Sequence, residues 1–199
     1  ERGGVQALEE FVLARYFMFI QVYFHKTRRY LDKALVKSLK ALLPNGKYPD
    51  SIQGYLKWDD SRVLNLIADS ENADVIAFKQ RKIMTCVLES KPHAPREEQK
   101  STRIIFNVLH REYGDSVIYD SVDKAAHKLT PALLAPTDDS GKGIMILDEK
   151  TGEVKNIMNE SIILDSLVKP ICINRIYAEK DMAGKVLSSI KNIMLSEGP

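Results

Sequence analysis

Cysteine is scarce in this sequence, since Cys86 and Cys172 are the two cysteines among 199 residues. Disulfides form and persist in oxidising compartments, whereas thiols stay reduced in the cytoplasm. The start of the chain does not have the pattern of a secretory signal, because its apolar run is followed by basic residues and by no small-residue cleavage site. We therefore expect two free, small, buried thiols rather than a disulfide, in a protein of the cytoplasm.

Long hydrophobic runs and a strong excess of one charge are also absent. The longest apolar run covers residues 11–24 and is interrupted by Arg15 and Gln21, whereas a bilayer-spanning helix needs about 20 apolar residues. The formal net charge is +2, with 44% hydrophobic and 28% charged residues. These values are ordinary for a globular protein and indicate no general affinity for membranes or nucleic acids. We expect neither as a partner.

The first half of the sequence has the pattern of helices. Residues 5–43 contain neither proline nor glycine, and leucines recur there at helical spacing until a Pro-Asn-Gly turn ends the pattern. Asp59 and Asp60 are typical N-terminal capping residues, and they predict a short helix through Asp69. A third helix is predicted over residues 74–84. This half should therefore be helical throughout.

The pattern changes after the third helix. A charged helix is predicted over residues 96–113, with Ile105, Val108 and Leu109 on its buried face. Alternating apolar residues or short apolar runs predict strands at residues 86–88, 117–119, 143–147, 154–158 and 171–177. Asp181 is expected to cap a last helix.

These elements together predict an α+β fold. We expect a helical N-terminal half, residues 1–90, followed by a small mixed α/β subdomain with antiparallel hairpins, residues 91–199. The segment ILDEKTGEV indicates one such hairpin, because Gly152 can adopt the positive φ of a bulged turn.

Arg15 is the most informative residue of the opening helix. An apolar helix is expected to be buried, and an unpaired guanidinium inside a protein costs several kcal/mol, so Arg15 needs an anionic partner. An internal carboxylate is one possible partner. A phosphate is the other, because a continuous helix would place Arg15, Lys26 and Arg29 on one face near aromatic rings, as a nucleoside polyphosphate requires.

The stretch ARYFMFIQVYFHK, residues 14–26, resembles a helix of HD-domain metal-dependent phosphohydrolases with the pattern A-R-x-x-M-x-x-x-V-Y-x-H-K. This group includes deoxynucleoside triphosphate triphosphohydrolases. The later stretches LKWDDSRVLNLI, FKQRKIMTCV and PICINRIYAEKD occur in the order found in the same family. The resemblance spans most of the chain and corresponds to the region C-terminal to the HD motif.

The resemblance assigns roles to five residues. It implies that Arg15 and Tyr23 contact the triphosphate and sugar of the substrate. It also implies that His25, Lys26 and Arg81 bind a regulatory nucleotide at a subunit interface, so the partners expected are a deoxynucleoside triphosphate and further copies of the chain.

The catalytic residues of an HD enzyme are missing from this sequence. Such an enzyme holds its metal with a histidine, an adjacent His-Asp pair and a further aspartate, and the sequence contains no His-Asp pair. Phe19 stands where some members of the family have a histidine that assists at the active site. We therefore predict no catalytic residue and no metal ligand in this chain, and expect the divalent metal to be held by a part of the parent enzyme that precedes Glu1.

Two hypotheses follow for function. In the first, the chain is the C-terminal part of an HD-type phosphohydrolase and is inactive alone, which agrees with a sequence that begins at Glu1 rather than at methionine. It would contribute contacts to the substrate phosphates, contacts to a regulatory nucleotide, and oligomer surface. In the second, it is a stand-alone nucleotide-binding or assembly module without catalytic activity.

Overall fold

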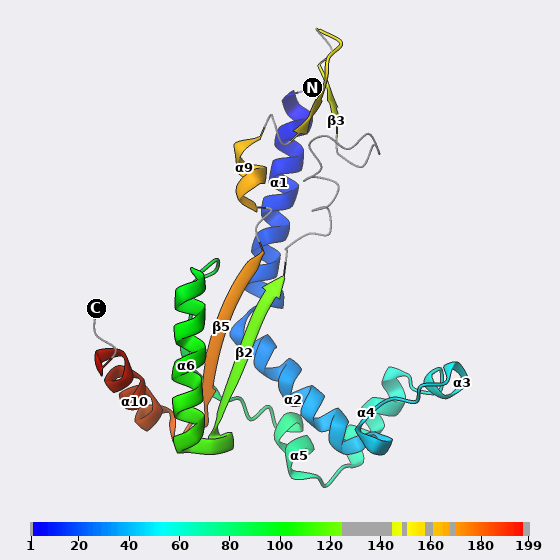
Figure 1. Ribbon diagram of the computed structural model, residues 1–199. Coiled ribbons are helices and arrows are strands. Elements are labelled where there is room, and N and C mark those ends of the chain that lie inside the picture. Colours follow the sequence, from blue (N-terminus) through cyan, green and yellow to red (C-terminus); the bar gives the residue numbers. More distant parts are fainter. Residues whose placement is uncertain (1, 125–144, 149–150, 158–160, 168–169, 197–199) are drawn as a thin grey trace.

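The computed structural model describes residues 2–124, 145–148, 151–157, 161–167 and 170–196. The chain begins with a helical arm and continues into a small sheet covered by helices (Figure 1). The α+β class predicted from the sequence is confirmed. Within the described residues, none of the helices combines the length and the apolar character that a membrane-spanning helix requires.

The helical arm contains the first helices of the chain. They are α1 (Arg2–Met18), the π-helix η1 (Phe19–Tyr23), α2 (Lys26–Leu42), the 3-10 turn η2 (Pro44–Gly46), α3 (Ile52–Tyr55), α4 (Asp60–Asp69) and α5 (Ala73–Lys79). Asp59 caps α4 as predicted, because its carboxylate accepts a 2.8 Å hydrogen bond from the backbone N–H of Arg62. The third helix ends at Lys79, earlier than predicted, and Arg81 follows it with φ of +51°.

One predicted helix is in fact two. The pattern over residues 5–43 predicts a continuous helix, but the backbone leaves the helical conformation at Phe24 and His25. His25 has φ −59° and ψ 135°, and its Nδ1 accepts a hydrogen bond from Thr27 N at 3.3 Å, which caps α2. The expectation that Arg15, Lys26 and Arg29 lie on one helix face is therefore wrong.

The sheet is formed by β1 (Thr85–Glu89), β5 (Ile171–Ala178) and β2 (Val117–Lys124), in that order. Both pairings are antiparallel, and β5 lies in the centre although it follows the other two in sequence. A separate antiparallel hairpin joins β3 (Met145–Leu147) to β4 (Val154–Asn156), as predicted, with Gly152 at φ +70° in its turn. The boundary between two subdomains at residue 90 stays a prediction. Strand β1, which precedes this boundary, pairs with β5, which follows it.

Two helices cover one face of the sheet, α6 (Arg96–Tyr113), preceding the 3-10 turn η3 (Gly114–Ser116), and α10 (Ala183–Ser196) (Figure 1). The bounds of α6 agree with the prediction. Ile105 and Leu109 on α6 are buried against Ile176 and Val186, as predicted. Val108 was predicted to be buried with them, but it is 40% exposed and lies outside the core. A polar residue, Thr102, occupies a buried position on α6 instead.

The opposite face of the sheet meets the junction of α1 and α2. Phe24 packs there against Val122, Ile171 and Ile173. At the far end of α1, a third cluster joins the buried Val12 to α9 (Ile162–Leu167).

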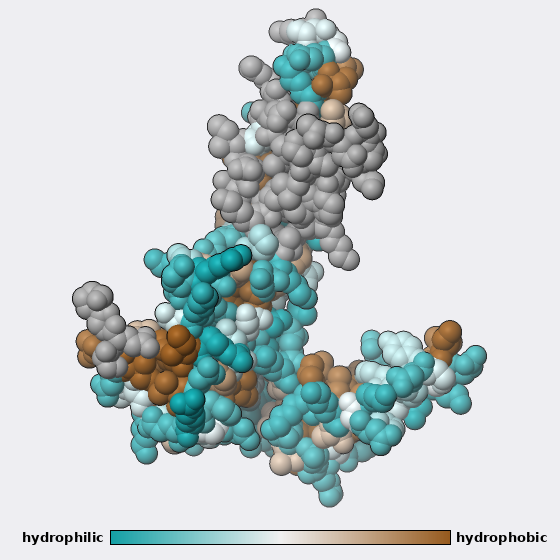
Figure 2. Space-filling model, in the orientation of Figure 1, coloured by the Kyte–Doolittle hydropathy of each residue, from teal (hydrophilic) through white to brown (hydrophobic). Residues whose placement is uncertain are grey.

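The first helix is much more exposed than the sequence predicts. Val12 is fully buried, but Phe11 and Phe17 are 57% and 47% exposed, and Val22 in η1 is 53% exposed. The apolar run therefore forms a surface strip rather than a buried helix. Hydrophobic side chains also gather on the surface over α10 and near α3 (Figure 2). Residues 143 and 144 of one predicted strand and residue 158 of another lie outside the described residues.

Candidate functional site

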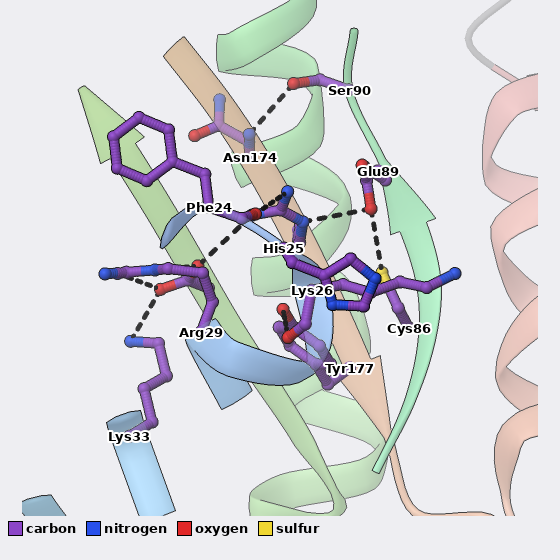
Figure 3. Close-up of polar contacts among 12 residues, drawn as sticks. Phe24, His25, Lys26, Arg29, Lys33, Cys86, Glu89, Ser90, Asn174 and Tyr177 are labelled. Carbon is purple, nitrogen blue, oxygen red and sulfur yellow. Dashed lines mark hydrogen bonds and ion pairs between the residues drawn. The ribbon is translucent and has the colours of Figure 1, made fainter. Parts of the chain in front are cut away.

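The break between α1 and α2 is held by polar side chains of the central strand. A helix end leaves backbone carbonyls without intrahelical partners. Arg175 Nη2 donates a 2.6 Å hydrogen bond to the carbonyl oxygen of Phe24, and the Tyr177 hydroxyl donates a 2.9 Å bond to that of Lys26 (Figure 3). Burial raises the pKa of Tyr177 well above its ordinary value, so the hydroxyl stays protonated and can donate. The break is thus a fixed feature of the fold.

A buried carboxylate lies beside this break. Asp120 on β2 is fully buried, and it accepts hydrogen bonds from Arg29 Nε at 3.0 Å and from Arg29 Nη2 at 2.8 Å. Lys33 Nζ lies 3.4 Å from Asp120 Oδ1, and Arg175 Nη1 lies 3.8 Å from Oδ2. The hydrogen bond to Asp120 raises the pKa of Arg29. Arg29 therefore has an internal carboxylate as its partner, which corrects its assignment to a phosphate-binding row.

A groove opens where α1, η1 and the start of α2 meet the end of β2. Its volume is about 390 Å³, and its lining residues are Arg15, Met18, Phe19, Tyr23, Phe24, Arg28, Arg29, Asp32 and Lys124. The described lining includes four positive side chains and one acid. Asp32 is paired with Arg28 through a 3.3 Å contact between Arg28 Nε and Asp32 Oδ1. Arg28 and Arg29 are thus both paired with carboxylates. The groove combines cationic side chains with aromatic rings on its wall, a combination that suits a phosphate-bearing ligand.

Both residues predicted to contact the substrate line this groove. The Arg15 guanidinium carbon lies 5.3 Å from the centre of the Phe19 ring, and that of Arg28 lies 5.5 Å from the centre of the Tyr23 ring. Arg15 is half-buried and Tyr23 is 41% exposed. Because the helix is largely exposed, burial alone no longer requires an anionic partner for Arg15. The position of Arg15 at a cationic groove agrees with a phosphate as that partner. The roles of Arg15 and Tyr23 stay predictions.

The described part of the structure contains no hydrogen bond or ion pair that joins all three residues predicted to bind a regulatory nucleotide. His25 and Lys26 lie at the break, beside Cys86 and Glu89 of β1 (Figure 3). Arg81 is exposed, beyond the end of α5, and among the described residues no hydrogen bond or ion pair joins it to His25 or Lys26. Their shared role stays a prediction, since a site at a subunit interface would include residues of another copy.

The described residues contain no group of three or more His, Cys, Asp or Glu side chains that could hold a metal ion. His93 instead contacts Tyr16, with its Nε2 3.2 Å from the tyrosine hydroxyl, and its Nδ1 lies 2.9 Å from the carbonyl oxygen of Pro170. The donor set of an HD metal centre does not fit the described part of the chain.

Sequence reasoning missed Asp120, Arg175 and Tyr177. One signal was available for two of them, because Arg175 lies among apolar residues in ICINRIYA and Asp120 directly follows the apolar run VIY. Charged side chains at such positions are paired when buried. The sequence gives no means of pairing them with Arg29 and with the carbonyl of Phe24, since these contacts join residues about 90 and 150 positions apart.

Comparisons with known proteins connect the helical arm to HD-domain proteins. Residues 1–85 match the family model described as "HD associated region". The chain is 24% identical over 203 residues to the uncharacterized protein YwfO of Bacillus subtilis (strain 168), a match that covers 92% of this chain and 47% of that protein. The crystal structure of a hypothetical protein from Aquifex aeolicus is similar with a TM-score of 0.71 and 26% identity, covering 96% of this chain and 46% of the other. The chain thus spans about half the length of the relatives it matches.

Proposed function

We propose that this chain is the C-terminal part of an HD-type metal-dependent phosphohydrolase that hydrolyses deoxynucleoside triphosphates. The observation that carries the proposal is the groove at the α1–α2 junction, where Arg15 and Tyr23 meet further cations. Arg15 and Tyr23 lie within residues 1–85, which match the HD-associated family. The family match alone supports a connection with HD-type phosphohydrolases. The groove adds a positively charged surface of suitable chemistry.

Arg15 and its neighbours act on the phosphate chain. Charge on the phosphate oxygens grows or is redistributed as the phosphorus–oxygen bond breaks, and fixed positive groups stabilise it. Arg15 and Lys124 approach the groove from different elements, so they can contact different oxygens of one polyphosphate. Tyr23 offers its exposed ring and hydroxyl to the sugar. The divalent metal of the parent enzyme is held elsewhere, by residues outside those described here.

The exposed strip on α1 and η1 is the surface that the catalytic half covers. Phe11, Phe17 and Val22 are each about half exposed, and several exposed apolar side chains on neighbouring turns are typical of an interface. The matched relatives are about twice as long as this chain. An additional segment of such a parent would bury the strip and bring its metal site to the Arg15 groove.

His25, Lys26 and Arg81 form the regulatory part of the proposal. His25 and Lys26 are exposed beside the break. An anion bound to them would therefore change the angle between α1 and α2. We assign them to a nucleotide site completed by a second copy of the chain, which makes the parent enzyme a homo-oligomer.

Binding of dATP, dGTP, dCTP and dTTP to the chain tests the groove, by isothermal titration calorimetry. A charge-assisted hydrogen bond contributes about 1.5–3 kcal/mol, so Arg15→Gln should weaken binding by about 10-fold or more. Arg62→Gln is the matched control, because Arg62 stacks on Trp58 at 4.2 Å on α4, away from the groove. Equal affinity of the Arg15 variant and the wild type would contradict the proposal.

A hydrolysis assay with Mn²⁺ or Mg²⁺ tests whether the catalytic residues lie outside this chain. The chain alone should not release triphosphate, whereas the longer parent should, and Arg15→Gln in that parent should lower kcat/KM. Turnover by the chain alone would contradict the placement of the catalytic residues in another segment.

A further inference from the structure

The first two turns of α6 face a pocket rather than the hydrophobic core. The core between α6 and the sheet is built by Ile105 and Leu109, in the second half of the helix. Toward the start of α6 the sheet instead presents polar residues, and a pocket of about 330 Å³ opens there. Its lining residues are Arg96, Gln99, Lys100, Arg103, Tyr119, Ser121 and Asn174.

Asn174 is a buried polar residue whose side-chain amide makes no hydrogen bond to the described residues. It is 3% exposed and lies on the central strand β5. Its backbone N–H donates a 3.0 Å hydrogen bond to Ser90 Oγ, and its backbone carbonyl accepts a 2.9 Å hydrogen bond from Ser90 N. Figure 3 shows its side-chain amide directed away from Ser90, and among the described residues no hydrogen bond to this amide exists. Because the next residue, Arg175, faces the α1–α2 junction, the Asn174 amide faces α6 and the pocket.

The amide atoms of Asn174 are not completely enclosed, because among the described residues the one fully buried side-chain N or O atom without a hydrogen bond is Arg175 Nη1. An amide without a protein partner that solvent can still reach is available to water or to a bound molecule. The amide of Asn174 has a donor group and an acceptor group at the bottom of the pocket, and both are available to a bound molecule. Ser121, directly opposite Asn174 on β2, adds a hydroxyl to the same wall.

The rim of the pocket is positively charged. Arg96, Lys100 and Arg103 are four and three residues apart, so they share one face of α6. The Arg103 guanidinium carbon lies 4.5 Å from the centre of the Tyr119 ring, which holds it over the opening. The described lining contains no acid. Hydrophilic side chains cover α6 on the face seen in Figure 2.

We propose that this pocket binds a small phosphate monoester of mononucleotide size. Arg96, Lys100 and Arg103 bind the phosphate, and the Asn174 amide and the Tyr119 ring contact the organic part. The volume lies at the lower end of the range for small-molecule sites, about 300–1,000 Å³. The site differs from the Arg15 groove, because it lies on the α6 face of the sheet and the groove lies on the opposite face.

The side-chain NH₂ signals of Asn174 in a ¹⁵N–¹H NMR spectrum of the chain report binding directly. Adenosine 5′-monophosphate, ribose 5-phosphate and inorganic phosphate are the probes. The two organic phosphates should shift these signals in a saturable way, and inorganic phosphate should bind more weakly because it lacks the part that contacts Asn174. No shift at millimolar concentrations of the organic probes would overturn the proposal.

Variants locate the site. Arg103→Gln and Asn174→Asp should each weaken adenosine monophosphate binding by at least about 10-fold, since one removes a positive charge and the other adds a negative one. Arg111→Gln is the matched control, because Arg111 is exposed on the same helix and does not line the pocket. Far-ultraviolet circular dichroism verifies that each variant is folded. Arg15→Gln should bind adenosine monophosphate as tightly as the wild type does. The test of this pocket is therefore independent of the test of the Arg15 groove. Wild-type affinity in the folded Arg103 variant would overturn it.

Discussion

Arg175 joins the central strand of the sheet to the break in the helical arm, because its Nη2 donates a 2.6 Å hydrogen bond to the carbonyl oxygen of Phe24. The same side chain, 2% exposed, donates from Nε to Glu89 Oε2 at 3.1 Å. Its Nη1 is buried and has no hydrogen bond among the described residues, lying 3.8 Å from Asp120 Oδ2. One guanidinium therefore connects β5, β1 and the junction of α1 with α2.

Replacing Arg175 with methionine should destabilise the chain by about 3–5 kcal/mol, the range for removing one member of a buried charge cluster. The methionine fills part of the volume but leaves the Phe24 carbonyl without its donor. Urea unfolding measures the loss, and faster amide hydrogen exchange from Phe24 to Thr27 should accompany it.

The control for this prediction is Glu89→Gln. The Glu89 side chain is 42% exposed, so its ion pair is screened by solvent and its loss should cost less than about 1 kcal/mol. A loss in Arg175→Met no larger than the loss in Glu89→Gln would contradict the structural role of Arg175.

The pair of Arg29 and Asp120 should show strong thermodynamic coupling. Two hydrogen bonds, at 3.0 and 2.8 Å, join the guanidinium to a fully buried carboxylate. A double-mutant cycle with Arg29→Gln and Asp120→Asn should give an interaction free energy of about 1–3 kcal/mol. The pair of Arg28 and Asp32, both exposed, should give about 0.3–0.5 kcal/mol in the same cycle. Similar values for the two pairs would contradict the assignment.

Cys86 should make the stability of the chain depend on pH in the alkaline range. Burial raises the pKa of its thiol from 9.0 to about 11, with a further contribution from the charge of Glu89. Between these two values the unfolded state loses the proton first, so the stability contributed by the neutral thiol is present below pH 9 and is lost as the pH rises toward 11. Unfolding free energies of the wild type should therefore fall more steeply than those of Cys86→Ala between pH 9 and 11. Parallel curves would contradict this prediction.

Gly152 should be required for the β3–β4 turn. Its φ is +70°, a conformation that disfavours residues with a Cβ atom, although no heavy atom would lie within 4 Å of an added Cβ. Gly152→Ala should therefore destabilise the hairpin by about 1 kcal/mol through the backbone alone. Gly184→Ala, within α10 and equally free of neighbours, should stabilise by about 0.5–1 kcal/mol. Amide hydrogen exchange of the hairpin and thermal unfolding measure the two changes in stability. Changes in the same direction for both variants would contradict the prediction.

The sequence predicts those features that depend on neighbouring residues. The bounds of α6, the cap of α4 by Asp59 and the turn at Gly152 follow from local pattern and local chemistry, and the structure agrees with them. The break at Phe24 and His25 could not be predicted in this way. Helical propensity continues across it, and the residues that hold it belong to β5, about 150 positions later in the chain.

The candidate groove was predicted in part for a related reason. Arg15 and Tyr23 were identified from a motif, and both line the groove. Lys124 was not identified, because it comes from the end of β2 and only the fold brings it to η1. The exposure of α1 was also not predicted, since hydropathy alone does not distinguish a buried helix from a helix with exposed apolar side chains.

The position of β5 has a consequence for synthesis on the ribosome. Strands β1 and β2 emerge first, but neither pairs with the other, and their shared partner ends at Ala178. Neither nascent strand can therefore form its ladder until residues 171–178 have left the exit tunnel. Unpaired strand edges are sites of intermolecular association, so the chain is most exposed to such association between the emergence of β2 and that of β5.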